Sequence, residues 1–476
     1  MRYETVIGME VHVELQTASK MFCGCAADHF QVEANTHICP VCTAQPGALP
    51  VINGRAMKLT TMTGLALHCQ IRPHNVFARK NYIYPDLPKG YQVSQYELPL
   101  CEDGWVEITS EDGPKKIGVE RVHLEEDTGK LLHSGHASLV DYNRAGVPLM
   151  EIVTDASIRS ADEAFDYLNK IRQVVRYVGA SSGDMEKGAM RCEANISIRP
   201  EGSDEFGTKV EVKNLNSFRA VRNAIAYEVE RQQQVIEEGG QVRQVTMGWD
   251  EQMGITREQR SKETSEDYRY FPEPDLLDVH LEVEWINRIG RELPELPTDK
   301  AARFSKIYGL NQKDIAVLIE DAAVAAYFEE AAQHSGADPK LVANWVTGEI
   351  FRRLNDEDVL IADAKVSPAA LVELLALVKD GAINQNVARE VFTELWEKGG
   401  SPARIVETKG LKQIFDTSEL DEAVAKVIEA NPDAAEKIKG GNLKTVQFLM
   451  GQVMKETRGK ANPQLVQELI NKQLRV

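Results

Sequence analysis

The spacing of apolar residues changes once along this chain, and the change divides it into two kinds of structure. Up to about residue 290, short alternating segments are bounded by Gly, Pro, Asn and Asp, a pattern typical of strands and turns. From Thr298 onward, apolar residues recur at helical spacing and no segment resembles a strand. Pro294 and Pro297 lie between the two regions and indicate a linker. The sequence therefore predicts an α+β fold, with a mainly antiparallel sheet domain followed by helices.

Helical spacing also appears twice inside the first region, over Ser160–Tyr177 and Ser217–Glu238. In the second region, the clearest helices are expected over Asp314–Ala332 and Pro368–Val378. Glycine-rich breaks fall at residues 398–402 and 439–442, and 476 residues allow two to four domains. We expect three domains, over residues 1–292, 298–402 and 403–476.

The distribution of charge limits the kind of partner that the chain can bind. The start lacks the features of a signal peptide and no run approaches 18 apolar residues, so we expect a cytoplasmic protein without a membrane segment. The net charge of −18 argues against non-specific coating of nucleic acid. From Glu436 to the end, however, the sequence contains eight Lys and Arg residues and three acidic residues, so this tail carries a net charge of about +5. The tail is either a contact for RNA or a solvated helical surface. The cations proposed for RNA are Lys437, Lys439, Lys444, Lys455, Arg458 and Lys460.

Four cysteines form the sharpest local motif. Cys23 and Cys25 are separated by thirteen residues from Cys39 and Cys42. Two close pairs joined by a short loop suit tetrahedral Zn²⁺, and four thiolates would make the site structural. Disulfides or buried thiols are the alternative, and His29 or His37 could replace one sulfur. The solitary cysteines Cys69, Cys101 and Cys192 are expected in the core.

Carboxylates recur on one side of several expected strands. The period of two places Gly8, Glu10, His12 and Glu14 opposite the apolar residues of Val6–Leu15. The same alternation places further polar residues together: Arg121, His123, Glu125 and Asp127; Arg191, Glu193, Asn195 and Ser197; Lys209, Glu211 and Lys213. The solvated face of an antiparallel sheet would show the same pattern, so alternation alone does not indicate a site.

Glu151 differs from these residues, because it interrupts the apolar run Val147–Val153. A carboxylate among apolar residues must be paired, metal-bound or neutral. If the carboxylates converge, a pair about 4 Å apart repels by roughly 4 kcal/mol at an effective dielectric near 20. A cation or raised pKa values would then be needed, and oxygen ligands with one imidazole favour Mg²⁺.

Residues Arg79–Gln92 form a third cluster, in which cations alternate with aromatic and turn residues. Such a loop can hold phosphates and stack a base, or it can be an ordinary packed surface loop. The sequence contains no G-x-x-x-x-G-K-[ST], G-x-G-x-x-G or G-x-S-x-G motif. A nucleotide site would therefore be unconventional, and no residue is indicated as a covalent nucleophile.

Several segments together resemble the B subunit of the tRNA-dependent amidotransferase, the GatB family, which converts Glu-tRNA(Gln) or Asp-tRNA(Asn) to the amide. They are Ile7–Leu15, Arg79–Tyr82, Leu139–Ile152, Arg191–Ser197, Lys213–Ser217 and Asp267–Asp275, with 439–442 resembling the family's tail. The resemblance implies a cradle-shaped catalytic domain, a helical domain and a small helical tail that contacts tRNA.

The resemblance also implies a reaction and its partners. ATP phosphorylates the side-chain carboxylate of the misacylated aminoacyl group, and ammonia then displaces the phosphate. Ammonia comes from a partner amidase, the A subunit, with a small C subunit at their interface. This division of labour fits the lack of a nucleophile in this chain.

Site residues follow from the same resemblance. One or two Mg²⁺ ions would be held by Glu10, His12, Glu125, Glu151, Glu193 and Glu211, of which the catalytic residues would be Glu10, His12, Glu125 and Glu151. Lys80, Tyr82 and Lys213 could contact the nucleotide or the acceptor end. The cysteine tetrad is absent from some members and is interpreted as a structural zinc site. Two alternatives remain: a non-catalytic, zinc-stapled tRNA-binding subunit, and a carboxylate-bound metallohydrolase that acts alone.

Overall fold

The computed structural model describes residues 2–261, 268–412, 417–440, 445–457 and 461–475. The chain divides into two compact units, Met1–Pro297 and Thr298–Val476. This division falls within the predicted change from strands to helices. Among the described residues, no helix is long and apolar enough to cross a membrane.

The first unit is built on a nine-stranded sheet with the order β14-β13-β12-β11-β1-β10-β7-β6-β2. Its neighbours are antiparallel except for the parallel pair β12 and β13. The strands are β1 (Tyr3–Glu14), β2 (Gln70–Ile71), β6 (Cys101–Ser110), β7 (Gly113–Glu126), β10 (Pro148–Thr154), β11 (Met190–Pro200), β12 (Val210–Leu215), β13 (Val245–Asp250) and β14 (Ile255–Ser261). The predicted mainly antiparallel sheet is therefore confirmed, whereas the cradle shape stays a prediction.

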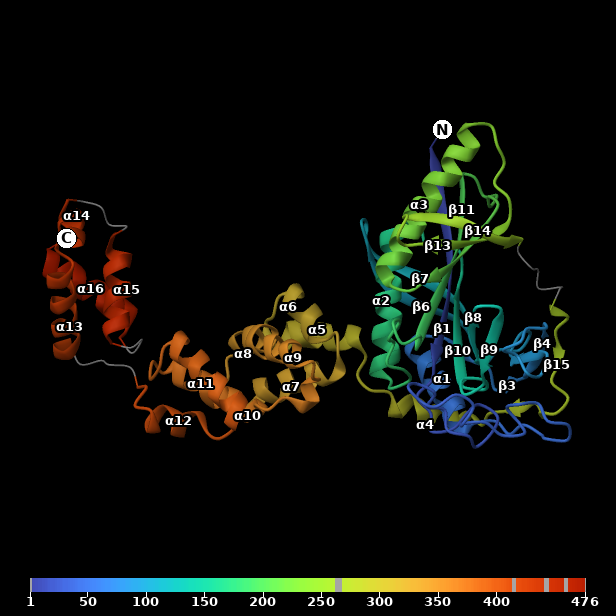
Figure 1. Cartoon of the computed structure of the whole chain (residues 1–476), viewed down its shortest axis with the longest axis horizontal. Coiled ribbons are helices and arrows are strands. Elements are labelled where there is room, and N and C mark those ends of the chain that lie inside the picture. The colour runs from blue at the N-terminus through green and yellow to red at the C-terminus, as the bar shows by residue number, and fades with distance from the viewer. Residues whose placement is uncertain (1, 262–267, 413–416, 441–444, 458–460, 476) are drawn as a thin grey trace. The chain divides into compact units, whose positions relative to one another are not determined.

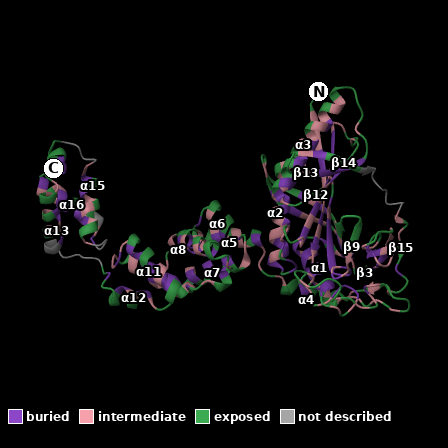
Figure 2. Cartoon of the chain, in the orientation of Figure 1, coloured by how far each residue is buried: buried purple, intermediate pink, exposed green. Residues whose placement is uncertain are grey.

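The two faces of this sheet differ as the alternation predicted. Ile7, Met9 and Val11 of β1 are fully buried in the main hydrophobic core. Helices α2 (Ala161–Tyr177) and α3 (Phe218–Glu237) lie together on one side of the sheet, and their apolar residues join this core (Figure 1). Burial is highest along the central strands, and exposed residues concentrate on loops and outer helix faces (Figure 2). The polar side chains of β1 therefore face away from these helices.

Both helices predicted in this unit are confirmed almost to the residue. Ser160 and Ser217 precede them, and each side chain accepts a hydrogen bond from a backbone N–H of the first turn. Two further helices of the unit are α1 (Gly54–Ala66) and α4 (Val283–Glu292). Asn53 caps α1 in the same way.

Smaller sheets lie beside the large one. They consist of β15 (Phe271–Pro272), β4 (Ala78–Asn81) and β5 (Tyr91–Ser94); β16 (Val279–His280) and β3 (His74–Asn75); and β8 (Lys130–Ser134) and β9 (Ala137–Asp141). The predicted loop Arg79–Gln92 is therefore wrong at its ends, because residues 78–81 and 91–94 pair as strands. This pairing fixes the backbone of Lys80 opposite Gln92.

The second unit is helical throughout its described residues. Its elements are α5 (Pro297–Tyr308), α6 (Gln312–Leu318), α7 (Ala322–Gln333), α8 (Pro339–Trp345), the π-turn Val346–Ile350, α9 (Phe351–Glu357), the 3₁₀ turn Ile361–Asp363, α10 (Pro368–Lys379), α11 (Gln385–Lys398), α12 (Pro402–Thr408), α13 (Thr417–Ala430), α14 (Pro432–Lys439), α15 (Val446–Glu456) and α16 (Pro463–Leu474). The helix predicted over Pro368–Val378 is confirmed as α10. The single helix predicted over Asp314–Ala332 is wrong, because the Asp321 side chain accepts hydrogen bonds from Ala323 and Val324 and starts a new helix.

Two hydrophobic clusters organise this second unit. One includes residues from Phe304 to Leu411, and the other includes residues from Leu420 to Leu474. Val406 and Leu411 of the predicted tail domain pack into the first cluster, so this core extends beyond the predicted boundary at residue 402. The division into three domains stays a prediction.

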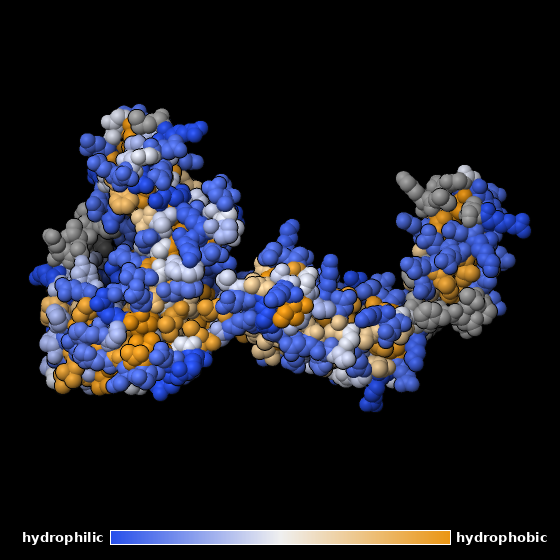
Figure 3. Space-filling view, turned by 180° about the vertical axis from the view of Figure 1, so that it is seen from behind, coloured by the Kyte–Doolittle hydropathy of each residue, from blue (hydrophilic) through white to orange (hydrophobic). Residues whose placement is uncertain are grey.

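On the side of the first unit opposite to that seen in Figure 1, hydrophobic residues gather over part of the surface (Figure 3).

Candidate functional site

The polar face of the large sheet brings together the carboxylates that the alternation singled out. Antiparallel pairing places His12 opposite Glu151, and Glu151 opposite His123 on the next strand. One step along β1, Glu10 lies opposite Glu193 on β11. Cross-strand partners point to the same face of a sheet, so these side chains converge although they come from four strands.

The first group consists of His12, Glu125 and Glu151. One potential ligand atom from each lies within 4.8 Å of the others. The His12 Nε2 atom is 3.9 Å from a carboxylate oxygen of both Glu125 and Glu151. His123, the cross-strand partner of Glu151, lies beside them, with its Nε2 atom 3.0 Å from Glu151 and 3.3 Å from Glu125. Two imidazoles therefore surround two buried carboxylates.

The imidazoles decide the charge of this first group. Burial raises the pKa of Glu151, but the positive charges of His12 and His123 outweigh it and lower the pKa well below its ordinary value. Burial lowers the pKa of His123, but the charge of Glu151 and hydrogen bonds to both carboxylates raise it to about 9. Burial and the charge of Glu151 raise the pKa of Glu125, but His123 and Lys80 outweigh them and lower it. Both carboxylates are therefore ionised near neutral pH and available as metal ligands.

The second group consists of Glu10, Glu193 and Glu211, whose closest ligand atoms also lie within 4.8 Å of one another. Lys213 pairs with Glu193 at 2.7 Å and approaches Glu211 at 4.0 Å. The Asn195 amide donates to Glu10 at 2.8 Å. Three carboxylates thus share one neighbouring ammonium group.

This second group has an electrostatic strain that the first group lacks. Burial raises the pKa of Glu10, and the neighbouring charges of Glu151 and Glu193 raise it further. Burial lowers the pKa of Lys213, but the charges of Glu193 and Glu211 outweigh it and raise the pKa. Because like charges are held together here, a bound cation would relieve their repulsion.

Lys80 and Tyr82 lie beside the first group, as a contact with a ligand would require. Burial lowers the pKa of Lys80, but the charge of Glu125 outweighs it and raises the pKa. The Tyr82 hydroxyl donates to Gln92, whose amide donates to Glu125 at 3.0 Å. The Lys80 ammonium also lies 5.0 Å from the centre of the Tyr268 ring.

Several residues of the site were missed by sequence reasoning. His123 was placed on the polar face but not assigned to the site, although its alternation with Glu125 gave the signal. Gln92 and Ser94 of β5 hydrogen-bond Glu125, with Ser94 donating at 2.8 Å, and Thr246 of β13 donates to Glu211 at 2.7 Å. Neutral polar residues of this kind carry no distinctive sequence pattern.

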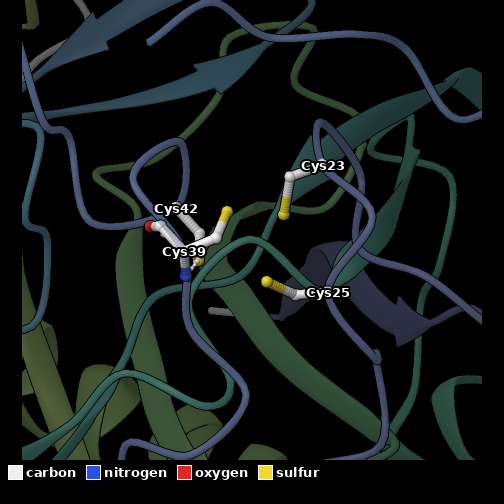
Figure 4. A group of neighbouring side chains, drawn as sticks. All are labelled: Cys23, Cys25, Cys39 and Cys42. Carbon is white, nitrogen blue, oxygen red and sulfur yellow. Dashed lines mark hydrogen bonds between the residues drawn. The ribbon is translucent and has the colours of Figure 1, made fainter.

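The four cysteines of the predicted zinc loop form a separate group. Their sulfurs lie within 4.8 Å of one another, and Figure 4 shows the side chains pointing toward a common centre. Tetrahedral Zn–S bonds of about 2.3 Å place sulfurs about 3.8 Å apart, and the Cys39 and Cys42 sulfurs are 3.9 Å apart. A hydrogen bond from Cys23 lowers the pKa of the Cys42 thiol to about 5. This donor set could hold a zinc ion.

Other residues around this group restrict its ligands. His29 is hydrogen-bonded to Glu14 at 3.0 Å, and the His37 ring to the Asp28 carbonyl at 2.7 Å, so neither replaces a sulfur. The fully buried Lys20 ammonium lies 3.7 Å from the Cys42 sulfur. The cysteines outside the loop, Cys69, Cys101 and Cys192, are buried as expected.

The predicted tRNA-binding cations lie in the second unit. Lys437 and Lys439 are exposed in the last turn of α14, and Lys455 is exposed in the last turn of α15. The other three, Lys444, Arg458 and Lys460, lie outside the described residues.

The fold and its polar face define a class of protein in which a mainly antiparallel sheet presents grouped carboxylates and a helical region follows. The chain belongs to the GatB family. Residues 5–287 match the GatB/GatE catalytic domain, and residues 326–474 match the GatB domain.

Its relatives include proteins named as the B subunit of aspartyl/glutamyl-tRNA(Asn/Gln) amidotransferase. The protein of this name from Thermodesulfovibrio yellowstonii is 52% identical over 477 residues, covering 100% of both chains. That from Caldanaerobacter subterraneus is 50% identical over 475 residues, again covering 100% of both chains. The similarity therefore extends over the helical unit as well as the sheet.

Proposed function

We propose that this chain activates the side-chain carboxylate of Glu-tRNA(Gln), of Asp-tRNA(Asn) or of both with ATP, and that the activated group is then amidated. The observation that carries this proposal is the convergence of two carboxylate groups, one of which includes His12, with Lys80 and Lys213 beside them. The names of the relatives, as subunits of a tRNA amidotransferase, support the choice of substrate.

The residues present suit Mg²⁺, because five of the six ligands are carboxylates, which are hard oxygen ligands, and only His12 contributes an imidazole. His12, Glu125 and Glu151 would hold one ion, and Glu10, Glu193 and Glu211 a second. Bound Mg²⁺ would neutralise phosphate charge and align the reacting oxygens.

The chain's own residues then position the substrates. Lys80 and Lys213 lie where an ammonium group can pair with phosphate or with the incoming carboxylate, and the hydrogen bonds of Ser94 and Gln92 hold Glu125 in place. A substrate carboxylate oxygen attacks the γ-phosphorus, and ADP leaves. Ammonia then attacks the carbonyl carbon of the acyl phosphate, and phosphate leaves with a proton released.

Other components complete the reaction in this proposal. Ammonia comes from a partner amidase, the A subunit, with a small C subunit at the interface, because no residue of this chain is indicated as a nucleophile for glutamine hydrolysis. The cations of the C-terminal tail contact the tRNA, and the reaction takes place in the cytoplasm. The cysteine loop holds structural zinc.

The test is ATP-dependent amidation of misacylated tRNA by this chain reconstituted with its two partner subunits. We expect Glu125→Gln to lower the rate by at least about 100-fold, since preorganised charge at a reacting centre contributes this much. Glu107→Gln, at an exposed position of the same sheet, is the matched control and should retain full activity. Full activity of Glu125→Gln would refute the site.

The alternative is a non-catalytic tRNA-binding subunit, in which the polar face is only solvated. It predicts no phosphate release from ATP in the presence of Glu-tRNA(Gln), and no effect of Glu151→Gln or His12→Ala. The burial of Glu125 and Glu151 does not favour it, because a solvated face would leave these side chains exposed.

A further inference from the structure

A third group of metal-ligating side chains lies away from the polar face of the large sheet, on the small sheet of β3 and β16. His74 of β3 is paired with His280 of β16. A carboxylate oxygen of Asp278 lies 2.9 Å from the His74 Nε2 atom. One potential ligand atom from each of the three residues lies within 4.8 Å of the others. Because 204 residues separate His74 from Asp278, this group has no motif in the sequence.

The backbone holds the two histidines side by side. Cross-strand partners in an antiparallel pair present their side chains on the same face of a sheet. The rings of His74 and His280 are stacked, with their centroids 4.7 Å apart and their planes inclined by 4°. The Leu281 backbone N–H also donates to the Pro73 carbonyl at 2.7 Å, so the pairing continues past the strand ends. Both imidazoles are therefore held near one point at the surface.

The distances in this group suit a shared ion. Zn²⁺ binds imidazole nitrogen and carboxylate oxygen at about 2.0–2.2 Å, which places the ligand atoms of a tetrahedral site about 3.3–3.5 Å apart. The atoms here lie between 2.9 and 4.8 Å apart. The side chains of His74 and Asp278 are 46% and 54% exposed, so they can rotate by the roughly 1 Å that bonding requires. Water can then take the fourth position.

The ligand types decide which ion would bind. Two imidazoles with one carboxylate favour Zn²⁺ and similar transition ions, whereas carboxylates and water favour Mg²⁺. The groups on the polar face have the opposite composition, because the first contains one imidazole and two carboxylates and the second contains three carboxylates. Excess Mg²⁺ can therefore occupy the polar face while Zn²⁺ is added to the histidine pair.

We propose that His74, Asp278 and His280 bind a divalent transition ion such as Zn²⁺, and that this ion clamps β16 to β3. The site is separate from the cysteine loop and from the carboxylate groups. The inference goes beyond the proposed function and does not depend on it.

The clamp would act on the segment that leads from the carboxylate site to α4. At the start of this segment, the Arg79 guanidinium donates two hydrogen bonds to the Glu273 carboxylate, at 2.7 and 2.8 Å. Further along, β16 is only two residues long, and a pair of short strands is marginally stable by itself. An ion at His280 would give the segment a second fixed point just before α4.

The other side of the clamp is connected to the large sheet. Asn75 follows His74 on β3, and its fully buried side chain accepts a hydrogen bond from Gln95 at 2.9 Å. The Gln95 side chain in turn accepts a hydrogen bond from the Leu124 backbone at 3.2 Å. Leu124 precedes Glu125 on β7. The ion would therefore fasten the segment to a strand that is itself held on the large sheet.

The first test is titration of the full-length chain with Zn²⁺ by calorimetry, with the cysteine loop already loaded with zinc and with Mg²⁺ in excess. The wild type should bind one more ion than His280→Gln. Four-ligand zinc sites reach Kd values of about 50 nM or tighter, so three exposed ligands should give about 1–10 μM. His136→Gln changes another exposed histidine and should keep the full stoichiometry.

Two further variants separate metal binding from an effect on the local fold. His280→Cys removes the ring stack but supplies a thiolate, which is itself a zinc ligand, so it should retain the additional ion. Asp278→Asn keeps the shape but removes the anionic ligand, and it should weaken binding by at least about tenfold. Thermal unfolding without Zn²⁺ should show that every variant folds, since Asp278 and His280 are exposed.

Hydrogen exchange then tests the clamp. If β16 must release the ion before it can separate from β3, Zn²⁺ at 100 times its Kd should slow exchange of the Leu281 amide by about 100-fold. The same addition should leave exchange in His280→Gln unchanged. Equal Zn²⁺ stoichiometry in the wild type and His280→Gln, or no slowing of exchange in the wild type, would overturn the inference. Neither measurement uses ATP or tRNA, so its failure would leave the proposed function intact.

Discussion

Glu10 lies close to other carboxylates, and their mutual repulsion is expected to destabilise the folded protein when no cation is bound. Glu10 lies within 4.8 Å of Glu193 and Glu211, and its pKa is raised by burial and by neighbouring charge. Glu10→Gln keeps the shape and can still accept the hydrogen bond from Asn195. The variant should therefore be more stable than the wild type in the absence of divalent cations.

The size of this gain follows from the distances. Two unit charges 4.8 Å apart repel by about 3.5 kcal/mol at an effective dielectric of about 20. Lys213 pairs with Glu193 and offsets part of this repulsion. The free energy of unfolding of Glu10→Gln should therefore exceed that of the wild type by about 1–2 kcal/mol, which raises Tm by about 2–5 °C for a domain of this size.

Thermal unfolding with EDTA and with Mg²⁺ measures the effect. At a Mg²⁺ concentration ten times its Kd, binding stabilises the wild type by about 1.4 kcal/mol, and Glu10→Gln should lose much of this gain. The pH dependence has a definite sign. Because the folded pKa of Glu10 lies above its ordinary value, the wild type loses stability as pH rises through that folded pKa. The advantage of the variant in EDTA should therefore vanish below about pH 4.5.

A control variant tests whether the effect is specific to the carboxylate group around Glu10. Glu201→Gln changes an exposed carboxylate and should leave Tm unchanged with and without Mg²⁺. If Glu10→Gln lowers Tm in EDTA, or if it keeps the full Mg²⁺ gain, the carboxylate group is not a strained cation site.

Three other predictions concern zinc, the helical unit and RNA. Lys20→Met should speed zinc loss to a chromogenic chelator by about tenfold or more, because the buried ammonium lies 3.7 Å from Cys42 and offsets thiolate charge; unchanged release would show that this contact does not matter. Asp321→Ala should lower the free energy of unfolding by about 1 kcal/mol through loss of the α7 cap, measured by urea denaturation. Lys437→Ala with Lys439→Ala should weaken tRNA binding and flatten its dependence on salt, and an unchanged slope would favour a merely solvated tail.

The sequence was sufficient to predict the polar and apolar faces of β1, β7 and β11 and the positions of α2 and α3. The alternation around Glu10 and His12 reports directly which side chains share a face, because the period of a strand is two. The serines before α2 and α3 mark helix starts by a local hydrogen bond. These features depend on residues close together in the chain.

Features that depend on the order of strands could not be predicted in this way. The six expected ligands share one face, but their division into two groups follows from β1 lying between β10 and β11. Gln92 and Ser94 reach Glu125 from a different sheet.

Hydrogen bonds link the loop between Cys25 and Cys39 to the strand that carries His12 and to the turn before the strand that carries Glu151. His29 of this loop hydrogen-bonds Glu14, the residue after His12 on the polar face of β1. The Asn35 side chain donates to the Val140 carbonyl and accepts from the Tyr142 backbone.

These bonds tie the loop to the turn that leads into β10, the strand of Glu151. The Asn143 side chain extends the same connection, donating to the Glu33 carbonyl and accepting from the His37 backbone. A zinc ion that fixes the loop would therefore hold both β1 and the start of β10 in register. Its contribution to catalysis would be to position His12 and Glu151, without contacting any substrate.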